Sequence, residues 1–536
     1  MPSDPQTAAI PFGPLLETSS EEISGGSPEA FNIIADARGT IRKRPGLAAY
    51  SVAPSTAVDA NGVLGLYLTE ERVAHTTGTA TVSGSHPGVL YAVGATVNAS
   101  GGGSNAGRNV YRIVGGAATI VGTGVANENR LATDALATTR TPRPIFAETE
   151  ALLIIAGGAQ VGRIDIRPET FSAPNFTNPN PDYHEMSFLA GCPPLASHVL
   201  TNSSRILAND TQLDQTKVRF SDISQGITSV TGHEDWAPSP GGPGFFTAEA
   251  RADSIVALHE NTNDIWGFGR TSLQLFQPDG STTFAPTVTS EFGCLAPYGI
   301  VKWDNSFVFL DHQTRIMMSD GGRKAEDLGG PIQATLDALT TPDDCYAYRF
   351  SESFANCLCF RFEADAITLV LQPGIGWSKW ALHTASSDAF SQFTVLSHHL
   401  RQDGGLNVVG LSDGTIRTLS MDNEDDLGAA IVAYCTTGFQ DRSSDNLKLS
   451  EAVHLTFKRT SALSHGVACY LEWRDDLSDE WTVIEIDLGV DDGNLTPTLT
   501  IRSLGTYRRR QWRFRFAAIA GLFLVRASET FRVLDN

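Results

Sequence analysis

The sequence is poor in the features that mark secreted and membrane-spanning proteins. Its 536 residues contain seven cysteines, an odd number at scattered positions, so we expect buried thiols and no disulfide framework. No apolar run approaches the roughly 20 residues that cross a bilayer. The segment from Met1 to Ile10 lacks the basic start and apolar stretch of a signal peptide. We therefore expect synthesis in the cytoplasm, no export by the usual route and no stable membrane insertion.

Basic residues are also in deficit, with 39 lysines and arginines against 60 aspartates and glutamates and a formal net charge of -21. Such a surface disfavours non-specific binding to nucleic acid through charge. An acidic channel wall would instead let a DNA duplex slide through without being gripped, which we keep as a hypothesis. The 41% hydrophobic content is ample for a large core and excludes a disordered chain.

Catalytic and metal-binding motifs are missing as well. There is no P-loop, zincin, nucleophile-elbow or EF-hand pattern. His233-Glu234 and His259-Glu260 look suggestive, but neither has a second histidine four positions after the first. Cys357 and Cys359 would share one face of a strand, without the second cysteine pair that a zinc site needs. The glycine-rich stretch 101–107 precedes a predicted strand and not a helix, so it predicts a flexible loop. We expect no cofactor, no metal and no enzymatic activity.

Two polar clusters have plain interpretations. The carboxylates Asp422, Glu424, Asp425 and Asp426 predict a solvated linker, because the sequence alone does not pair them as glycosidase acids. The Ser-x-Asp-x-Gly-x-x-Trp boxes of sialidase propellers are not found, although the segment 475–481 approximates one. His398-His399 predicts an exposed turn before the hairpin at Asp403-Gly404.

Strands and tight turns dominate what is present. Apolar residues alternate at many places, as in Leu64, Leu66 and Leu68, which indicates strands. Asp-Gly pairs between such runs indicate antiparallel hairpins, since these turns need positive φ; they begin at Asp279, Asp320, Asp403, Asp413 and Asp492. One short amphipathic helix is expected from Pro331 to Leu339.

The hairpins repeat with starts roughly 45 to 55 residues apart, the spacing of a four-stranded propeller blade. Two earlier hairpin groups, 62–81 and 89–121, would complete or decorate the ring. We therefore predict an all-β chain: a β-propeller of about six to seven blades with an appended β-sandwich-like carboxy-terminal domain. The expected division is 1–60 for an amino-terminal arm and first strands, 61–422 for the propeller and 423–536 for the carboxy-terminal domain. The repeating segments are 144–166, 195–221, 252–276, 295–327, 345–382 and 390–419.

Two basic runs are candidate interface sites. In the segment 508–516, Trp512, Phe514 and Phe516 would face the core of a strand while Arg513 and Arg515 face outward. That pattern suits either docking of an acidic partner or an ordinary solvated face. The second run, from Arg42 to Arg44, would sit at a subunit or adaptor contact or in an exposed turn. The candidate interface residues are Arg42, Lys43, Arg44, Arg508, Arg509, Arg510, Arg513 and Arg515.

Two motifs carry a family resemblance. The first runs from Ser27-Pro28-Glu29-Ala30-Phe31-Asn32 to Ile41-Arg42-Lys43-Arg44-Pro45-Gly46-Leu47, and the second is Phe292-Gly293-Cys294-Leu295-Ala296-Pro297-Tyr298, followed by Val308 to Asp311 and the helix-like 331–339. In this order they resemble the packaged-DNA stabilisation proteins, the tail hub or nozzle subunits of short-tailed bacteriophages. The resemblance covers residues 27 to 340.

This resemblance implies a non-enzymatic virion protein of the phage tail. It implies a homohexamer that forms a ring below the portal and its adaptor, the head-completion protein. The ring would extend the channel for packaged double-stranded DNA, retain the genome, and carry the tail needle, fibre or spike proteins.

Two other functional classes remain open. A receptor-binding or glycan-cleaving propeller of a phage tail predicts an axial pocket with aromatic residues and two carboxylates about 5 to 10 Å apart. A host cytoplasmic scaffold would not copurify with virions.

Overall fold

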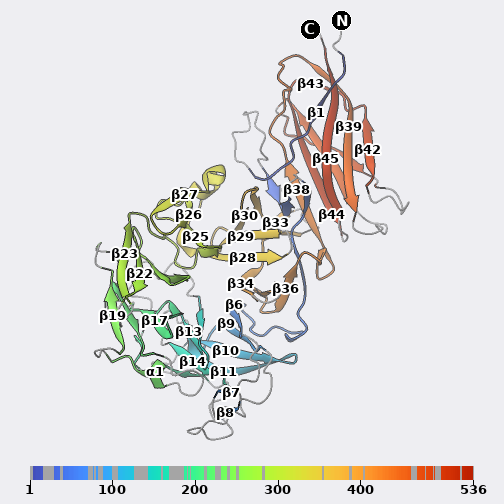
Figure 1. Cartoon of the computed structure of the whole chain (residues 1–536). Coiled ribbons are helices and arrows are strands. Elements are labelled where there is room, and N and C mark those ends of the chain that lie inside the picture. Colours follow the sequence, from blue (N-terminus) through green and yellow to red (C-terminus); the bar gives the residue numbers. More distant parts are fainter. Residues whose placement is uncertain are drawn as a thin grey trace.

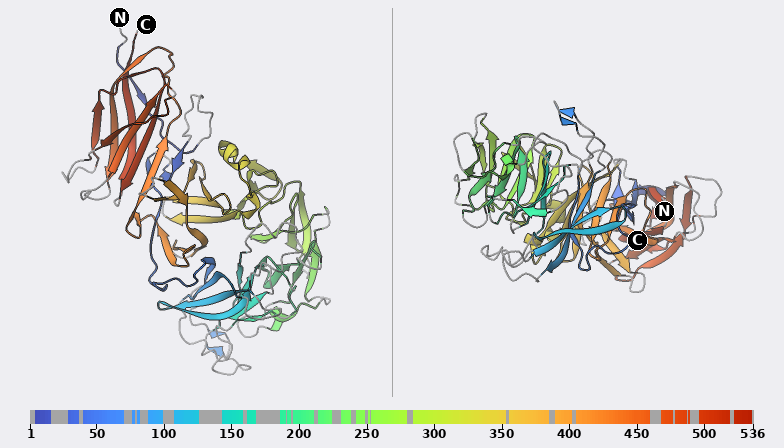
Figure 2. Two further views of the ribbon diagram at one scale, coloured as in Figure 1. Left: turned by 180° about the vertical axis from the view of Figure 1, so that it is seen from behind. Right: turned by 90° about the horizontal axis from the view of Figure 1, so that it is seen from below.

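The computed structural model shows a ring of small β-sheets with a second β-rich unit attached to one side (Figure 1). Both chain ends lie at the far tip of this second unit, and the views from behind and from below show the two units side by side (Figure 2). The structure describes all residues except 1–3, 16–28, 37–39, 70–75, 78–79, 82–87, 99–106, 126–142, 158–160, 168–185, 190, 194, 211–213, 224–230, 238–241, 249–250, 252, 280–283, 353–354, 385–388, 402–404, 460–467, 477, 487, 489–495, 519–521 and 535–536.

Four blades of the ring are formed by consecutive antiparallel strands. Blade 2 consists of β12 (Ile145–Glu148), β13 (Leu152–Ala156), β14 (Gly162–Asp165) and β15 (Met186–Phe188). Blade 3 consists of β16 (Val199–Asn202), β17 (Arg205–Asn209), β18 (Lys217–Phe220) and β19 (Gly244–Thr247). Blade 4 consists of β20 (Ala257–Asn261), β21 (Asp264–Phe268), β22 (Leu273–Pro278) and β23 (Phe284–Ser290). Blade 5 consists of β24 (Ile300–Trp303), β25 (Ser306–Leu310), β26 (Ile316–Asp320) and β27 (Lys324–Asp327).

Blades 1 and 6 flank this series. Blade 1 combines β6 (Val63–Leu68) with β9 (Leu90–Asn98), β10 (Gly107–Val114) and β11 (Ala117–Val125), so the two early hairpin groups belong to one blade. The short pair β7 (Thr76–Thr77) and β8 (Ala80–Thr81) is inserted after its first strand. Blade 6 consists of β28 (Tyr346–Glu352), β29 (Ala355–Phe362), β30 (Ile367–Gln372) and β31 (Gly376–Lys379). The pair β32 (Ala381–Thr384) and β33 (Ala389–Gln392) follows it.

Blade 7 closes the ring with a strand from the other end of the sequence. Its first three strands are β34 (Val395–Leu400), β35 (Asn407–Leu411) and β36 (Ile416–Ser420), and its outer strand is β5 (Gly46–Ala49). The first strand of this blade also contacts β6 of blade 1. The described residues therefore form a closed propeller of seven four-stranded blades, which confirms the predicted fold class.

Apolar side chains fill the space between neighbouring blades. Strands such as β13 and β17 are buried along their whole length, because each blade is covered on both faces by its neighbours. Separate clusters lie between adjacent blades: for example, Cys357 and Cys359 of blade 6 pack with Val409 and Leu419 of blade 7. All seven cysteines are free and six of them are buried; Cys192 is half-buried. The expectation of buried thiols is confirmed for those six.

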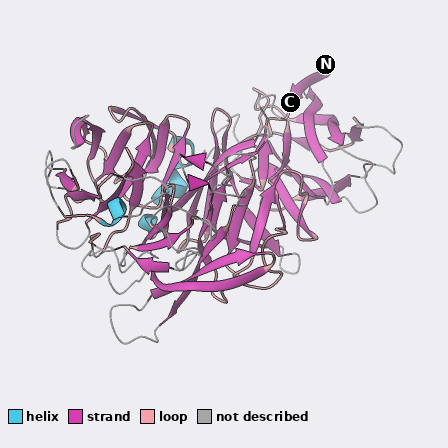
Figure 3. Ribbon diagram, turned by 60° about the horizontal axis from the view of Figure 1, so that its bottom comes forward, coloured by secondary structure: helices cyan, strands magenta, loops and turns pink. Residues whose placement is uncertain are grey.

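Helix is scarce in the described part of the chain (Figure 3). It consists of α1 (Thr231–Glu234), α2 (Gln333–Asp337) and two 3-10 turns at Gly330–Ile332 and Pro342–Asp344. The predicted helix is therefore present in shorter form, with Ile332 and Leu336 buried. Asp320-Gly321 and Asp413-Gly414 form hairpin turns in which the glycine has positive φ. The pairs at Asp279, Asp403 and Asp492, and the stretch 101–106, lie wholly or partly outside the described residues.

The carboxy-terminal unit is a sandwich of two sheets. One sheet consists of β3 (Ile33–Ala35), β4 (Ile41–Lys43), β45 (Leu522–Val533), β39 (Lys448–Arg459) and β42 (Thr498–Arg502), with β1 (Gln6–Ala9) on β45 and β43 (Thr506–Tyr507) on β39. The other consists of β38 (Ala429–Thr436), β44 (Arg510–Ala518), β40 (Ala468–Asp475) and β41 (Thr482–Ile486).

The core between these two sheets is aromatic and aliphatic. Trp512, Phe514 and Phe516 of β44 are buried, and the ring of Phe514 lies 5.7 Å from that of Phe457 on β39. The predicted alternation of this strand is therefore confirmed. The strand β2 (Ala30–Phe31) lies between β31 of blade 6 and β38 of the sandwich, and β37 (Asp425–Asp426) lies between β5 of blade 7 and β38, so the two units share one continuous sheet.

Candidate functional site: the axial cavity

A cavity of about 1040 Å³ lies at the axis of the propeller. It is lined by the innermost strands of blades 1 to 4, 6 and 7, where the sheets end and their inward side chains cannot meet a further strand. The residues that line it are Leu64, Gly65, Leu66, Tyr67, Pro144, Ile145, Phe146, Ala147, Glu148, Thr149, Glu150, Val199, Leu200, Thr201, Asn202, Ser203, Ser204, Arg205, His233, Leu258, His259, Glu260, Tyr346 and His398.

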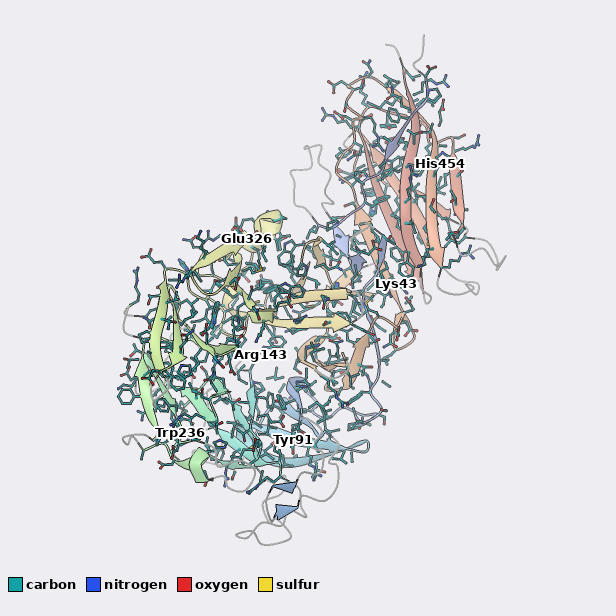
Figure 4. The ribbon with its side chains drawn as sticks, in the orientation of Figure 1. Lys43, Tyr91, Arg143, Trp236, Glu326 and His454 are labelled. Carbon is teal, nitrogen blue, oxygen red and sulfur yellow. The ribbon has the colours of Figure 1, made fainter. Side chains whose placement is uncertain are left out.

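Near one end of the cavity, Arg143 adjoins the lining residues Pro144 and Tyr346; it precedes the inner strand of blade 2 and lies near the middle of the ring (Figure 4). Its guanidinium crosses to the opposite blades, where Nη1 donates to the carbonyl of Leu396 and Nη2 donates to Glu363 at 3.2 Å. The same group lies 4.3 Å from the centre of the Tyr346 ring. The buried Arg143 side chain therefore ties blade 2 to blades 6 and 7 across the axis.

The other end carries polar side chains from three consecutive blades, and we call it the mouth. Glu148 ends the inner strand of blade 2 and Glu150 follows it, Asn202 ends that of blade 3, and Glu260 is near the end of that of blade 4. Asn202 Nδ2 donates to Glu260 Oε1 at 2.9 Å. Burial raises the pKa of the Glu260 carboxyl, against the hydrogen bond from Asn202 and the charge of Lys302.

Histidines from several elements reach the same cavity. His233 of α1 is buried, with 1% of its surface exposed, and both His259 and His398 lie on innermost strands. Burial lowers the pKa of His233, that of His259 to about 4 and that of His398 to about 3, so the imidazoles are neutral at neutral pH. Both His-Glu pairs of the sequence thus contribute to one site, although the Glu234 carboxylate pairs with Arg163 instead.

The predicted exposed turn at His398-His399 is wrong. Both residues lie in the second half of β34, the inner strand of blade 7. His398 shares a hydrogen bond with Asn407 at 3.0 Å between Nε2 and Oδ1, and it stacks on Tyr348. His399 packs against the ring of Tyr67. The polar residues are tolerated inside because an axial strand faces a cavity and not a neighbouring sheet.

Within the described part of the chain, no three histidine, cysteine or acidic side chains are grouped so that they could hold a metal ion. Over the same residues, no helix is both long enough and apolar enough to span a bilayer.

The basic run at Arg42 to Arg44 lies at the junction of propeller and sandwich (Figure 4). Lys43 and Arg44 are almost fully buried. Lys43 Nζ lies 3.3 Å from Glu424 Oε2, and Arg44 Nη2 lies 2.6 Å from Asp426 Oδ2. The prediction that 422–426 is a solvated linker is therefore wrong for these two carboxylates, which neutralise the basic run. A simple exposed turn at Arg44-Pro45-Gly46 is also wrong, since all three residues are buried.

Asn32 and Arg44 explain why this junction needs its particular sequence. Asn32 adopts a φ of 54°, a region that asparagine tolerates better than most residues. Its Oδ1 accepts from Ala381 N at 2.8 Å and from Arg44 Nε at 3.0 Å, and its Nδ2 donates to the carbonyl of Val432 at 2.8 Å. A Cβ on Gly46 would lie 2.2 Å from the carbonyl oxygen of Asp425, so only glycine fits.

The carboxy-terminal arginines have different environments. Arg510 is fully buried and forms two hydrogen bonds with Asp475, of 2.6 and 2.8 Å. Arg513 and Arg515 face away from the core and share Glu472, at 2.9 and 3.0 Å. Arg508 and Arg509 are exposed at the start of the strand. None of these residues lines the axial cavity, and the role of the eight basic residues in an interface stays a prediction.

The second motif links blade 4 to blade 5. Cys294 is buried and its thiol contacts the carbonyl of Ala296 at 2.9 Å, while Tyr298 stacks on His198 of blade 3. A Cβ on Gly293 would lie 2.3 Å from the backbone of Arg270. The motif therefore fixes the approach of one blade to the next.

Sequence reasoning missed most of the axial site. Glu148, Glu150, Asn202 and Arg143 carry no local signal, because each is defined by where a blade places it. The positions at and next to the ends of the first strand of each repeat would have found them once the blade order was known.

The comparison with protein families agrees with the propeller. Residues 233–319 match the family described as "Bacteriophage P22 Gp10, beta-propeller". This range contains blade 4 and the motif that joins it to blade 5. No curated protein matches the sequence significantly. Among solved structures, selenomethionine-substituted virginiamycin B lyase from Staphylococcus aureus is similar with a TM-score of 0.37 and 10% identity, over 68% of this chain and 96% of that chain. A similarity of this size carries no information about activity.

Proposed function

We propose that the chain is a structural protein of a bacteriophage tail, and that it forms the hub or nozzle of a short-tailed phage. The observation that carries this proposal is the family match over blades 4 and 5. The amino-terminal motif supports it from a second place in the chain. Its residues Asn32, Arg44 and Gly46 have structural roles at the propeller-sandwich junction, so they carry the resemblance through folding and not through catalysis.

In this proposal six copies form a ring that extends the channel below the portal and its adaptor, retains the packaged DNA and carries needle, fibre or spike proteins. In this role the protein acts through its shape and its contacts with neighbouring subunits, and it catalyses no reaction. Arg508 and Arg509 are the exposed members of the eight candidate basic residues, and so are the ones that an acidic partner could reach. We place the protein in the virion after its synthesis in the host cytoplasm.

The test is quantitative mass spectrometry and cryo-electron microscopy of purified particles. We expect about six copies per particle at the tail vertex. Particles from a phage with an amber codon in the gene, grown with and without a suppressor, provide the matched control. Absence from particles, or capsids that keep their DNA equally well without the protein, would refute the proposal.

A glycan-binding or glycan-cleaving propeller is the second candidate, and the axial cavity is the observation that favours it. Tyr67, Phe146 and Tyr346 supply aromatic rings there, and Glu148 and Glu260 supply carboxylates. Release of reducing sugar from host surface polysaccharide, abolished by Glu260→Gln, would support this candidate over the structural one.

A further inference from the structure

The sandwich and the rest of the chain differ strongly in charge. Residues 1–426, which include the whole propeller, contain 46 acidic and 26 basic side chains, whereas residues 427–536, which form most of the sandwich, contain 14 acidic and 13 basic ones. Nearly all of the net charge of -21 therefore belongs to the first part. The sandwich projects from one side of the ring (Figure 2), so a nearly neutral unit extends from a strongly acidic one.

Three cations of the larger sandwich sheet carry no ion pair. Lys458 lies on β39, Arg526 on β45 and Arg502 at the end of β42. All three side chains are exposed, and none of them makes an ion pair within the described part of the chain. A fourth cation of the same sheet, Arg532, is paired with Glu451 at 2.9 Å. The sheet thus presents three unpaired positive charges in an otherwise acidic protein.

The strand register places these three cations on one face. The residues that flank Thr456 in β39 are buried in the core, so Thr456 and Lys458 point outward. Arg526 is the partner of Thr456 in β45, and Thr498 is its partner in β42. Arg502 follows Thr498 by four positions, which is the same side of a strand. We call this outer surface of β42, β39 and β45 the basic face.

Short side chains separate the cations and keep the basic face flat. Thr456 and Thr498 share a hydrogen bond of 3.2 Å between their hydroxyls, and in the next row His454 Nδ1 lies 3.0 Å from Thr500 Oγ1. His454 is labelled on this sheet in Figure 4. Because these groups already bond to one another across the strands, they form an ordered floor above which the longer cations stand.

An aromatic ring joins the basic face to the junction with the propeller. Phe523 is the partner of Lys458 in the register, and Lys458 Nζ lies 5.8 Å from the centre of its ring. Arg42 lies over the same ring at 4.9 Å. Arginine and aromatic side chains together are typical of protein interfaces. The basic face therefore continues to one of the candidate interface residues of the amino-terminal run.

We propose that the basic face docks on the acidic propeller of a second copy of this chain. Charge complementarity carries the proposal, because the excess of acidic side chains lies in the part of the molecule outside the basic face. Charges more than about 10 Å apart are largely screened in 0.1 M salt, so the local charges of the two surfaces decide the approach and the net charge does not.

Such a contact joins two different surfaces, the sandwich of one copy and the propeller of the next. A contact of this kind repeats from copy to copy and closes into a ring or continues as a filament. The inference rests on the proposed ring for its biological role. Duplex DNA is the other acidic polymer to consider, but three phosphate contacts give weak binding and the net charge of -21 opposes it. The observations therefore favour the second copy.

Sedimentation velocity of the full chain measures the self-association. We expect oligomers in 0.1 M sodium chloride and a dissociation constant roughly tenfold or more higher in 1 M, because the Debye length falls from about 10 to about 3 Å. A monomer at every protein concentration in the lower salt, or an association that salt does not weaken, would overturn the proposal. So would duplex DNA that displaces the second copy and is itself released by Lys458→Glu.

Lys458 also gives a chemical readout of the contact. Residues 427–536 contain two lysines, and the other one, Lys448, is buried. A carbodiimide links a lysine amine to a carboxylate that touches it, and a mixture of nitrogen-15-labelled and unlabelled chains identifies the links between copies. We expect links from Lys458 to acidic residues of the seven blades. Links between copies that never involve Lys458 would contradict the basic face, and this measurement needs no variant.

Variants locate the contact. Lys458→Glu and Arg526→Glu should each raise the dissociation constant roughly tenfold or more, with an unchanged melting temperature because both side chains are exposed. The matched control is Arg509→Glu, which makes the same change of charge at an exposed arginine beside β44 of the other sheet. An equal or larger loss in the control would show that net charge or the other sheet decides the association, and would refute the basic face.

The contact and the tail role fail separately. Six copies per particle, with a purified chain that stays monomeric, would refute the contact and leave the role. Oligomers that depend on the basic face, formed by a protein that is absent from particles, would refute the role and leave the contact.

Discussion

The substitution Asp426→Asn should loosen the strand that closes the propeller. Asp426 Oδ1 and Oδ2 accept from Arg44 at 3.1 and 2.6 Å, and Oδ1 also accepts from the backbone N–H of Leu47 at 3.2 Å. The Arg44 side chain is 1% exposed and that of Asp426 is 13% exposed. The variant leaves a buried guanidinium with only neutral acceptors.

Removing one partner of a buried ion pair costs about 3 to 5 kcal/mol. The lower end applies here, because Asp426 is partly exposed and the neutral acceptors Asn32 Oδ1 and Pro45 O, at 3.0 and 2.9 Å, remain. We therefore expect the local opening free energy of β5 to fall by about 3 kcal/mol, which is roughly a 100-fold change in the opening equilibrium.

Native-state hydrogen exchange measures this change directly, because amides report the free energy of local opening. The amides of Leu47 to Ala49 should exchange about 100-fold faster in the variant, while those of β25 in blade 5 should not change. Glu291→Gln is the control, since its pair with Arg251 is exposed and worth at most about 1 kcal/mol. Unchanged exchange in β5, or equal acceleration in β25, would show that the ion pair does not hold the closing strand.

Three further predictions concern stability and reactivity. Glu529→Gln should destabilise the sandwich by about 3 kcal/mol or more, because the fully buried Glu529 accepts from Arg442 Nη2 and Tyr507 OH, both at 2.9 Å. Near-ultraviolet circular dichroism on heating measures the loss of stability, and a melting temperature equal to that of wild type would contradict the prediction. The pKa of His398 is lowered to about 3 and that of His399 to about 4, so below the unfolded value of 6.5 the unfolded chain binds protons that the folded chain does not. Stability should therefore fall as the pH is lowered from 7.5 to 5, and His398→Gln should show a smaller fall in melting temperature over that interval; an identical fall would refute the assignment. Burial raises the pKa of the thiols of Cys357 and Cys435. A thiol reagent should therefore leave the six buried cysteines of the native chain unlabelled, and it should label all seven cysteines of the unfolded chain. Rapid labelling of more than one thiol in the native chain would be inconsistent with the structure.

The parts of the fold that were predictable are local. Hairpin turns such as Asp413-Gly414 and alternating strands such as 512–516 are set by neighbours in sequence, and their spacing indicated the blades. The closing strand β5 was not predictable in this way, because its partner strand is 370 residues away in the sequence and neither strand carries a pairing signal. The exact division of residues between arm, propeller and carboxy-terminal unit depends on the same long-range pairings.

The site was only partly predictable for a related reason. His233-Glu234 and His259-Glu260 were noticed as pairs, yet only the ring places them beside Asn202 and Glu150. The acidic residues Glu424 and Asp426 were interpreted as solvated because their partners lie far upstream. The opposite charges of 42–44 and 424–426 were the available signal, since complementary runs in an otherwise acidic chain indicate pairing.

The outer strand of blade 7 has a consequence for synthesis. Ala48 and Thr418 are 370 residues apart, so the ribosome needs roughly 20 to 70 s at about 5 to 20 residues per second before β5 can meet its partner. During that interval the nascent chain carries an unpaired strand near its beginning and an unfinished circle of blades behind it. The strand β1 stays unpaired for longer still, because its partner β45 is synthesised near the end of the chain. Cells that make this protein must therefore keep the emerging amino-terminal segment from pairing with other nascent chains, and slow translation should increase its aggregation.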